Sequence, residues 1–215
     1  MKDADRGSVA TVCSLAVREI PKRMAVDLVV EHHYLHRKPP ISFCFGLFDG
    51  ETVCGACTFG TPPSRHAQQS VCPSKPALAV ELNRLWVCDS QPRNTESWFV
   101  SRCLRMLPPV IVFSYADSMF GHAGYIYRAL NFRYAGWTDM ERKTARFDYI
   151  PLSGGHTRDA FRTGYSDRVR RKPKAKYWMP TGSQTDKKRL TAMCGWPTLD
   201  WKAHPPPSEH SKFGE

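Results

Sequence analysis

Long apolar runs are missing from this sequence, and none approaches the roughly 20 residues that a membrane-spanning helix requires. The first residues mix acidic and basic side chains and lack the apolar core of a secretory signal peptide. We therefore expect a cytoplasmic protein that does not cross a membrane. In that compartment the eight cysteines are expected to stay reduced and not to form a disulfide framework.

Acidic residues are scarce relative to basic ones. The chain holds 31 Lys and Arg against 20 Asp and Glu, which gives a formal net charge of +11. From residue 153 onward there are 13 basic and 6 acidic residues, so most of the excess lies in the last third. There the segment 168–178 sets basic side chains beside Tyr177 and Trp178. This pattern favours contact between the basic side chains and nucleic-acid phosphates, with the two aromatic side chains as stacking or packing groups. The alternative is a basic face that is only solvated.

The chain of 215 residues, 41% of them hydrophobic, is long enough for one α/β domain with an appendage. Apolar patterns and turn residues predict strands at 9–17, 41–48, 52–59, 81–87, 110–115, 134–137 and 146–150, the last two closing the sheet. Helices are predicted at 21–33, 95–107 and 121–130, and a polar loop at about 61–75. We expect a main domain at 1–152 and a basic extension at 153–215 that packs on it or continues it, with a loosely ordered tail after about 203.

Residues 80–132 form the unit around which the rest of the chain is organised. The pattern predicts strand, turn, helix, strand and helix, with Thr95 capping the first helix. Polar side chains gather near the ends of the two strands, among them Glu81, Asn83 and Asp117. Because α/β proteins place their chemistry at strand ends, we expect a candidate active site here. Asp117 could instead cap the helical turn that follows it.

Five segments spread over the chain form a distinctive set: 33–40 (HYLHRKPP), 58–65 (TFGTPPSR), 81–87 (ELNRLWV), 114–118 (SYADS) and 146–150 (RFDYI). Together they resemble the Mom DNA-modification proteins of Mu-like bacteriophages, which are similar to GNAT acyltransferases. The resemblance covers roughly residues 32–176. It implies a GNAT-like α/β fold with a central mixed, mostly antiparallel sheet flanked by helices. It also implies conversion of adenine in double-stranded DNA to N6-carbamoylmethyladenine, which protects phage DNA from host restriction enzymes.

The resemblance also implies where an acyl donor would bind. In the GNAT pattern the strand at 81–87 splays from its neighbour, and backbone groups of Leu85, Trp86 and Val87 would hold the donor in the slot. The next turn normally carries glycines whose N–H groups bind a pyrophosphate at a helix N-terminus. The donor-binding candidates of that turn are Arg93, Asn94, Thr95 and Ser97. The turn has no glycine and includes an acidic residue, which disfavours ordinary coenzyme A binding.

The implied product carries one nitrogen more than an acetyl group provides, so plain acetyl transfer cannot form it. A glycyl group on N6 has the required atoms. Its free amine can attack C6 through a five-membered ring and expel the original nitrogen as an amide, without a redox step. We therefore favour an activated glycine such as glycyl-tRNA as the donor. Acetyl-CoA with iron-assisted radical chemistry is the alternative.

The reaction needs a group that activates the exocyclic amine and an acid for the leaving group. The catalytic candidates are His33, Tyr34, Glu81, Asn83, Asp117 and Tyr127. Tyr127 lies where the GNAT pattern has its Tyr general acid, although it could be a packing aromatic. Arg84 lies on the opposite face of the strand from Glu81, and an arginine there is more often an ion-pair partner than a site residue. An iron site would use His32, His33 and His36.

The candidates for DNA contact lie in the polar loop and the basic extension. They are Ser64, Arg65, His66, Arg158, Arg162, Arg168, Arg170, Arg171, Lys172, Lys174 and Lys176. Most are expected to contact phosphates and so to position the duplex. Adenine must leave the base stack to present N6, and Tyr115 and Tyr149 are candidates for a base pocket.

Two other functions remain open from the residues alone. One is an aminoacyl- or acyltransferase for proteins or small amines, whose basic extension binds only tRNA. The other is a DNA-binding protein that has lost catalysis on the same fold. The polar group of Glu81, Asn83, Asp117 and Tyr127 argues against the second.

Overall fold

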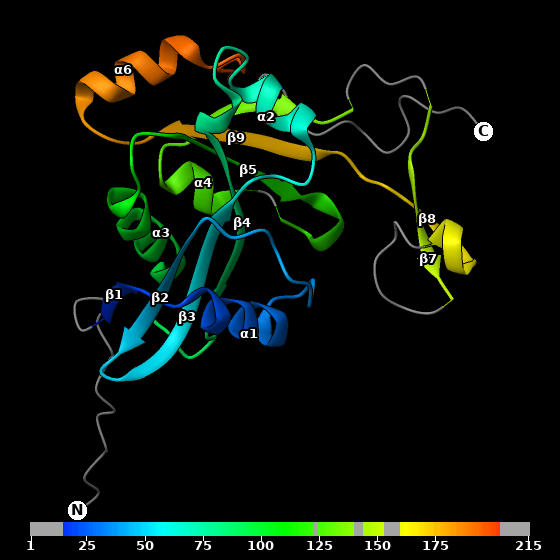
Figure 1. Cartoon of the computed structure of the whole chain (residues 1–215), viewed down its shortest axis with the longest axis horizontal. Coiled ribbons are helices and arrows are strands. Elements are labelled where there is room, and N and C mark those ends of the chain that lie inside the picture. The colour runs from blue at the N-terminus through cyan, green and yellow to red at the C-terminus, as the bar shows by residue number, and fades with distance from the viewer. Residues whose placement is uncertain (1–14, 123, 140–143, 153–159, 203–215) are drawn as a thin grey trace, which may run out of the picture. The chain divides into compact units, whose positions relative to one another are not determined.

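A computed structural model of the chain describes residues 15–122, 124–139, 144–152 and 160–202 (Figure 1). The strands are β1 (Leu15–Glu19), β2 (Phe43–Asp49), β3 (Thr52–Gly60), β4 (Ala79–Val87), β5 (Ile111–Asp117), β6 (Arg133–Trp137), β7 (Phe147–Pro151), β8 (Tyr165–Arg170) and β9 (Lys174–Pro180). The helices are α1 (Lys22–His32), α2 (Arg65–Val71), α3 (Thr95–Met106), α4 (Tyr125–Ala129), α5 (Ala160–Thr163) and α6 (Gln184–Met193), with short 3-10 turns η2 (Pro76–Leu78) and η3 (Ser118–Phe120). Within the described ranges, no helix has the length and apolar character to cross a membrane.

Seven strands form one sheet in the order β1-β2-β3-β4-β5-β9-β6, while β7 and β8 form a separate two-stranded sheet. The neighbours β1 to β4 are antiparallel, and β4 and β5 run parallel. Gly50, at φ +58°, occupies the tight turn between β2 and β3 that the Asp-Gly pair predicts. Helix α1 packs against β2 and β3, and α3 packs against β4 and β1. The predicted fold class, a mixed and mostly antiparallel sheet flanked by helices, is confirmed.

One compact unit contains the described residues up to Ser114 together with 126–133 and 178–197. Its core holds aromatic side chains that are almost fully buried, among them Phe45, Phe59, Phe99 and Trp178. The buried Thr181 fixes the end of β9 to the residues before β5. Its N–H donates to the Val110 carbonyl at 2.9 Å, and its hydroxyl donates to the Pro108 carbonyl at 2.7 Å. Part of the basic extension is therefore core structure.

Strand β4 departs from regular pairing at two points. It pairs with β5 only over Ala79–Glu81, opposite Ile111–Phe113, although β4 runs on to Val87. The splay expected between these strands is therefore present beyond Glu81. On its other edge, Thr58 pairs with Arg84 and Phe59 with Leu82, so Asn83 is an additional residue in a β-bulge.

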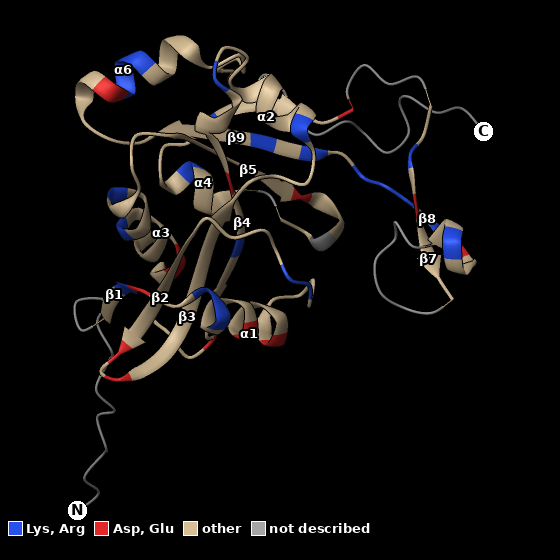
Figure 2. Ribbon diagram, in the orientation of Figure 1, with Lys and Arg blue, Asp and Glu red and all other residues tan. Residues whose placement is uncertain are grey.

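A second compact unit contains the described residues of 115–125, 134–177 and 198–202. It includes the β7–β8 sheet and α5, which contacts β7. Tyr134 contacts the rings of Tyr177 and Trp201 at centroid distances of 5.6 and 4.8 Å. Figure 2 shows blue basic residues along β9 and the segment that joins it to β8.

Some sequence-based predictions of elements are wrong. The polar loop at 61–75 contains helix α2, which buries Val71 and is held by a hydrogen bond from Gln68 Nε2 to the Ala79 carbonyl at 3.1 Å. Asn94, at φ +69°, caps α3, while Thr95 is its first residue. Tertiary contacts override the weak local signals in both places.

Later in the chain, the helix expected at 121–130 is reduced to α4, after the 3-10 turn η3. The strand at 146–150 pairs with β8 and does not close the main sheet. Tyr177 and Trp178 are 0% and 2% exposed, so they pack in β9 and are not available for stacking. β8, β9 and α6 lie where the sequence indicated only a basic extension.

Candidate active site

Tyr127 on α4 is connected to the diverging strands by a chain of hydrogen bonds. Its hydroxyl lies 2.8 Å from the Oγ of Ser114 on β5, and that Oγ donates to the Leu82 carbonyl of β4 at 2.8 Å. Because Ser114 has one proton and gives it to the carbonyl, Tyr127 must donate to Ser114. The chain ends on a carbonyl, so it positions the phenol and does not carry protons away.

Polar groups surround this phenol in a poorly solvated environment. Burial raises the pKa of Tyr127 to about 12 against the opposing hydrogen bond with Ser114, and Tyr34, Cys57 and Glu81 raise it further. These electrostatic interactions place Tyr34, Glu81 and Tyr127 in one group. At physiological pH Tyr127 is therefore a neutral proton donor, the form that a general acid requires.

Asn83 is fixed at the β-bulge by two short hydrogen bonds. The buried Thr58 donates from Oγ1 to Asn83 Oδ1 at 2.6 Å, and Asn83 Nδ2 donates to the Pro40 carbonyl at 2.7 Å. The amide thus joins β3 and β4 to the segment that follows α1. Gly60 permits this approach, since a Cβ there would lie 2.0 Å from the Pro40 carbonyl oxygen.

Arg84 is a candidate that the sequence did not reveal. Its Nη1 donates to the Asn83 carbonyl at 2.6 Å, and its Nε is buried without a hydrogen-bond partner in the described part of the chain. Burial lowers the pKa of Arg84, whereas Tyr34 and Glu81 act in the opposite direction. The guanidinium, which keeps its charge, therefore belongs to the Tyr34–Glu81 group and could stabilise a developing oxyanion. The bulge at Asn83 breaks the regular alternation of side chains between the two faces of β4, and no residue type in the sequence predicts it.

The three histidines at the end of α1 and just after it have separate surroundings. His32 stacks on Trp86 of β4 with ring centroids 4.1 Å apart, and the buried His33 stacks on Tyr34 at 4.2 Å. His36, at φ +44°, places Nδ1 3.0 Å from a backbone carbonyl of α1. Within the described residues, no group of three or more His, Cys, Asp or Glu side chains is arranged to hold a metal ion. The rings of His33 and Tyr34 are thus stacked on each other. In the described residues, His32, His33 and His36 are not arranged as a set of metal ligands.

The predicted donor site has one suitable part and one unsuitable part. Leu85, Trp86 and Val87 pair with β3 on one edge, after the register with β5 has ended, so the other edge of β4 suits backbone contacts with a donor. At the start of α3, Ser97 and Thr95 donate their hydroxyl protons to carbonyls within the turn itself.

Coenzyme A does not fit this turn well. Arg93 and Asn94 are exposed, Thr95 is buried, and Glu96 puts a negative charge in the first turn of α3. A pyrophosphate held by backbone N–H groups favours glycine and disfavours a carboxylate at such a position. The predicted departure from coenzyme A binding is consistent with this geometry.

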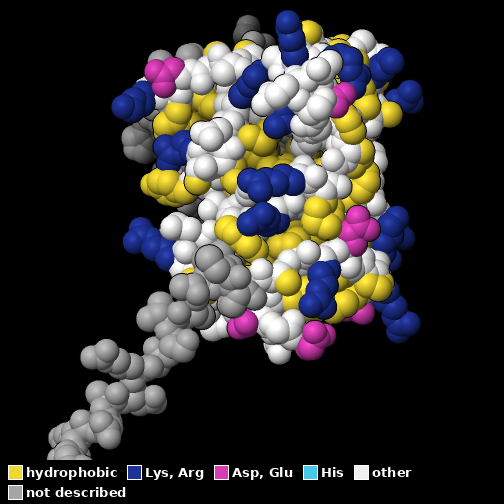
Figure 3. Space-filling view, turned by 90° about the vertical axis from the view of Figure 1, so that its left-hand side faces the viewer, with side chains coloured by type: hydrophobic (Ala, Val, Ile, Leu, Met, Phe, Trp, Pro, Cys, Tyr) yellow, Lys and Arg dark blue, Asp and Glu magenta, His cyan; other side chains and the backbone are white. Residues whose placement is uncertain are grey.

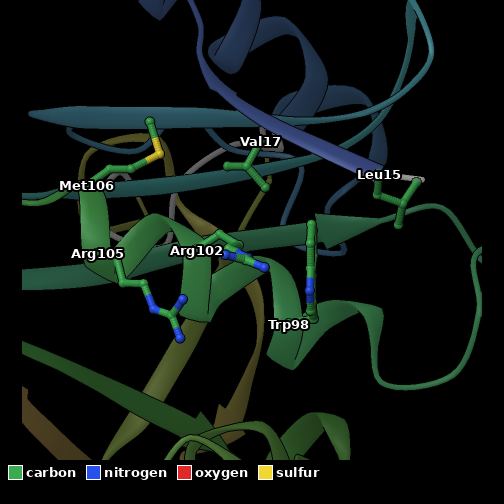
Figure 4. A pocket seen from close by; sticks show the side chains of 6 residues that line it. All are labelled: Leu15, Val17, Trp98, Arg102, Arg105 and Met106. Atoms are coloured by element: carbon green, nitrogen blue, oxygen red, sulfur yellow. The ribbon is translucent and has the colours of Figure 1, made fainter. Parts of the chain in front are cut away.

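A groove of about 540 Å³ lies between β1 and α3. It is lined by Leu15, Val17, Trp98, Arg102, Arg105 and Met106, none of which belongs to the predicted donor or catalytic set. Figure 4 shows Trp98 standing between α3 and the strand that carries Leu15. Figure 3 views the molecule from the side on which Figure 1 labels β1 and α3, and basic side chains there are set among apolar ones.

Asp117 at the end of β5 has two structural partners. Its Oδ1 accepts a hydrogen bond from Met119 N at 3.1 Å and caps η3, and its Oδ2 lies 2.5 Å from Lys174 Nζ. The carboxylate is 6% exposed. The helix-cap alternative for Asp117 therefore matches the structure, and Lys174, a predicted DNA contact, is an ion-pair partner.

The other predicted DNA contacts fall into distinct places. Ser64, Arg65 and His66 are exposed where α2 begins. Exposed residues around β8 include Arg162, Arg168, Arg170 and Lys172. Arg171 forms an ion pair with Asp148, Lys176 is half-buried on β9, and Arg158 lies outside the described residues.

The two tyrosines predicted for a base pocket have different surroundings. Tyr115 is half-buried on β5 of the main sheet. Tyr149 is on β7 of the small sheet, where its ring contacts Phe161 and Tyr165 at 4.7 and 4.8 Å. The structure therefore gives no reason to assign them to one pocket.

Comparison with known proteins shows to which family the chain belongs. Residues 14–192 match the model of the Mom protein family, and the chain belongs to that family. Methylcarbamoylase mom of Escherichia phage Mu is 32% identical over 129 residues, which are 57% of this chain and 54% of that protein. The match thus spans about half the length of this curated relative.

Several solved acetyltransferases are also similar to the chain. The ribosomal-protein-S18-alanine N-acetyltransferase of Escherichia coli has a TM-score of 0.46 at 12% identity, covering 79% of this chain and 95% of its own. An acetyltransferase of Salmonella typhimurium solved with acetyl-CoA has a TM-score of 0.44 at 11% identity, covering 80% and 96%. Scores of this size carry no conclusion about activity or cofactor.

Proposed function

We propose that this protein is a transferase that converts adenine in double-stranded DNA to N6-carbamoylmethyladenine and thereby protects phage DNA from host restriction. The observation that carries the proposal is the Tyr127–Ser114 hydrogen bond at the divergence of β4 and β5, in a chain of the Mom family. Tyr34 and Glu81 act electrostatically on both Tyr127 and Arg84. The name of the phage Mu relative, a methylcarbamoylase, supports the same chemistry.

The donor is an activated glycine, and glycyl-tRNA is the preferred form. Acyl transfer forms a bond between adenine N6 and the glycyl carbonyl carbon and releases the hydroxyl of the carrier. The glycyl amine then adds to C6, and the C6–N6 bond breaks, so that the former N6 leaves as the terminal amide nitrogen. Atoms and electrons balance without an oxidant. The net charge of +11 and the unsuitable coenzyme A turn support a nucleic-acid carrier.

Each residue of the group has a distinct task in this scheme. When substrate binds, the hydroxyl of Tyr127 turns its proton from Ser114 to the departing carrier oxygen and donates it there. Arg84 stabilises the oxyanion of the tetrahedral intermediate. Glu81 accepts the proton of the attacking amine, while Asn83 and the stacked His33–Tyr34 pair position the base.

The test is expression in cells grown on glycine labelled with both 13C and 15N, followed by nucleoside mass spectrometry of plasmid DNA. A modified adenine that carries both labels supports the DNA substrate and the glycyl donor. A modified adenine without label keeps the function and returns the donor to acetyl-CoA with metal chemistry. Unmodified DNA from cells that contain soluble protein would instead favour an acyltransferase for another amine, or a non-catalytic DNA-binding protein.

A further inference from the structure

The small sheet of β7 and β8 has two chemically different faces. Phe147 pairs with Arg170 and Tyr149 pairs with Arg168, so these four side chains share one face. The guanidinium of Arg168 lies over the Phe147 ring, 4.6 Å from its centroid, which confirms that assignment. This face, with aromatic and arginine side chains alternating, is called the basic face below.

The opposite face of the same two strands is acidic and aliphatic. Asp148 pairs with Val169, and Ile150 pairs with Asp167. Arg171 is directed to this side, where it forms its ion pair with Asp148. A polyanion would therefore be attracted to the basic face and repelled by the other.

An exposed apolar end completes the basic face. Tyr149, Phe161 and Tyr165 form a cluster of rings with centroids 4.7 to 5.9 Å apart. Phe161 is 73% exposed, and the neighbouring Leu152 is 68% exposed. Such apolar side chains on a two-stranded sheet, which is marginally stable by itself, indicate a binding surface.

We infer that this β-ribbon binds duplex DNA through Arg168 and Arg170 and holds a base step open with Phe161. The inference rests on the proposed function, since it gives the DNA substrate a docking element. Arginines on one strand face suit phosphate contacts along a groove, and apolar wedges such as Phe and Leu unstack neighbouring bases in known DNA complexes. Opening the stack is the step that makes N6 of a paired adenine accessible.

Duplex DNA fits this surface better than RNA. β-Ribbons and sheets bind in either groove of B-form DNA, including the minor groove, where apolar wedges enter the stack. In A-form RNA the major groove is too narrow for side chains to read, and the minor groove is shallow. Alternation of arginine with aromatic rings also matches alternating phosphates and bases better than it matches an acidic protein surface.

The test uses the full chain with Phe161→Ala, and Ile150→Ala as its matched control. Ile150 on β7 is 43% exposed on the opposite face and Phe161 on α5 is 73% exposed, so each change removes an exposed apolar side chain from this unit. The probes are a duplex that contains 2-aminopurine in place of adenine, whose fluorescence reports unstacking, and an unlabelled tRNA as competitor. Modification is measured in parallel on adenine opposite thymine and on adenine in a mismatch.

With the wild-type chain and the control, 2-aminopurine fluorescence should rise on binding. Phe161→Ala should abolish that rise and weaken duplex binding by about 5- to 150-fold, the range of one lost stacking contact. It should also reduce modification of paired adenine while leaving mismatched adenine, which is already easier to extrude, nearly unaffected.

Equal fluorescence for Phe161→Ala and the control would overturn the inference. It would also be overturned if Phe161→Ala lost its binding to tRNA but still bound the duplex as the wild-type chain does. If the wild-type chain modifies neither DNA, the proposed function fails separately. The fluorescence comparison then still decides the role of the ribbon: a rise lost only in Phe161→Ala supports it, and a rise kept in that variant overturns it.

Discussion

Tyr127 and Ser114 show how two side chains can define a site that neither forms alone. The Ser114 hydroxyl lies between a β4 carbonyl and the phenol, so the serine both closes the strand divergence and orients Tyr127. A tyrosine held in this way has a fixed position beside the point where β4 and β5 diverge. A buried tyrosine that only packs also usually has a hydrogen-bond partner, so a kinetic test decides between packing and catalysis.

Removal of the Tyr127 hydroxyl should affect chemistry more than folding. Tyr127→Phe should lower kcat for adenine modification by about 10²- to 10⁴-fold with little change in KM, because a general acid acts in the transition state. Rates come from mass spectrometry of the digested DNA. Tyr134→Phe is the control, since burial also raises the pKa of Tyr134 to about 12 but that residue lies in an aromatic cluster. Activity within a few-fold of wild type would remove Tyr127 from the mechanism.

The raised pKa of Tyr127 also predicts a pH dependence of stability. The unfolded chain begins to release this proton near pH 10, the ordinary value, while the folded chain retains it until about pH 12. The contribution is thus fully present below pH 10 and is lost as the pH rises through 12, amounting to roughly 2–3 kcal/mol. Urea titrations from pH 9 to 12 should show a shallower loss in Tyr127→Phe than in wild type. Parallel curves would contradict the assignment.

At the scale of elements, strand β4 combines a bulge with a divergence, and the bulge residue Asn83 binds the Pro40 carbonyl, which lies close to Gly60. Gly60→Ala should destabilise the fold by about 1–3 kcal/mol, because its Cβ would overlap the Pro40 carbonyl and displace the segment that Asn83 holds. Thermal or urea unfolding measures the change.

Gly50→Asn provides the comparison within the same hairpin. Gly50 has positive φ and open space around it, and asparagine tolerates that conformation. This variant should unfold close to the wild-type midpoint. A Gly60→Ala protein equally close to wild type would show that the Pro40 segment moves freely and does not fix Asn83.

Sequence patterns predicted those elements whose signal is local. The hairpin at Gly50, helix α3 and strands β4 and β5 follow from turn chemistry and apolar spacing, and the family resemblance led to Tyr34, Glu81 and Tyr127. The bulge that redirects Arg84 arises from pairing with β3, and the burial of Tyr177 arises from placement of β9 in the sheet. Neither of these long-range pairings can be recognised from neighbouring residues in the sequence. The strands β8 and β9 were therefore not predicted within the basic extension.

For the molecule as a whole, the excess of positive charge matters less than its distribution. Figure 2 shows basic residues on β9, the segment after β8 and α6. At the end of β8 and just after it, Arg171 forms an ion pair with Asp148, whereas Arg170 and Lys172 are exposed. A count of charges would treat these residues alike, but an exposed basic side chain can reach a DNA phosphate more easily than the one that is ion-paired with Asp148.

The triple change Arg170→Gln, Arg171→Gln and Lys172→Gln should therefore weaken duplex binding and flatten its salt dependence. Each lost phosphate contact lowers the slope of log affinity against log salt by roughly 0.9, and Arg171→Gln alone should account for little of the loss. Fluorescence anisotropy with labelled duplex at several salt concentrations measures both quantities. The control is Lys187→Gln, Lys188→Gln and Arg189→Gln on α6, which removes the same charge elsewhere. Equal slopes for the two triple variants would mean that net charge alone drives binding. A flatter slope only in the variant changed at residues 170–172 would assign the phosphate contacts to the end of β8 and the residues that follow it.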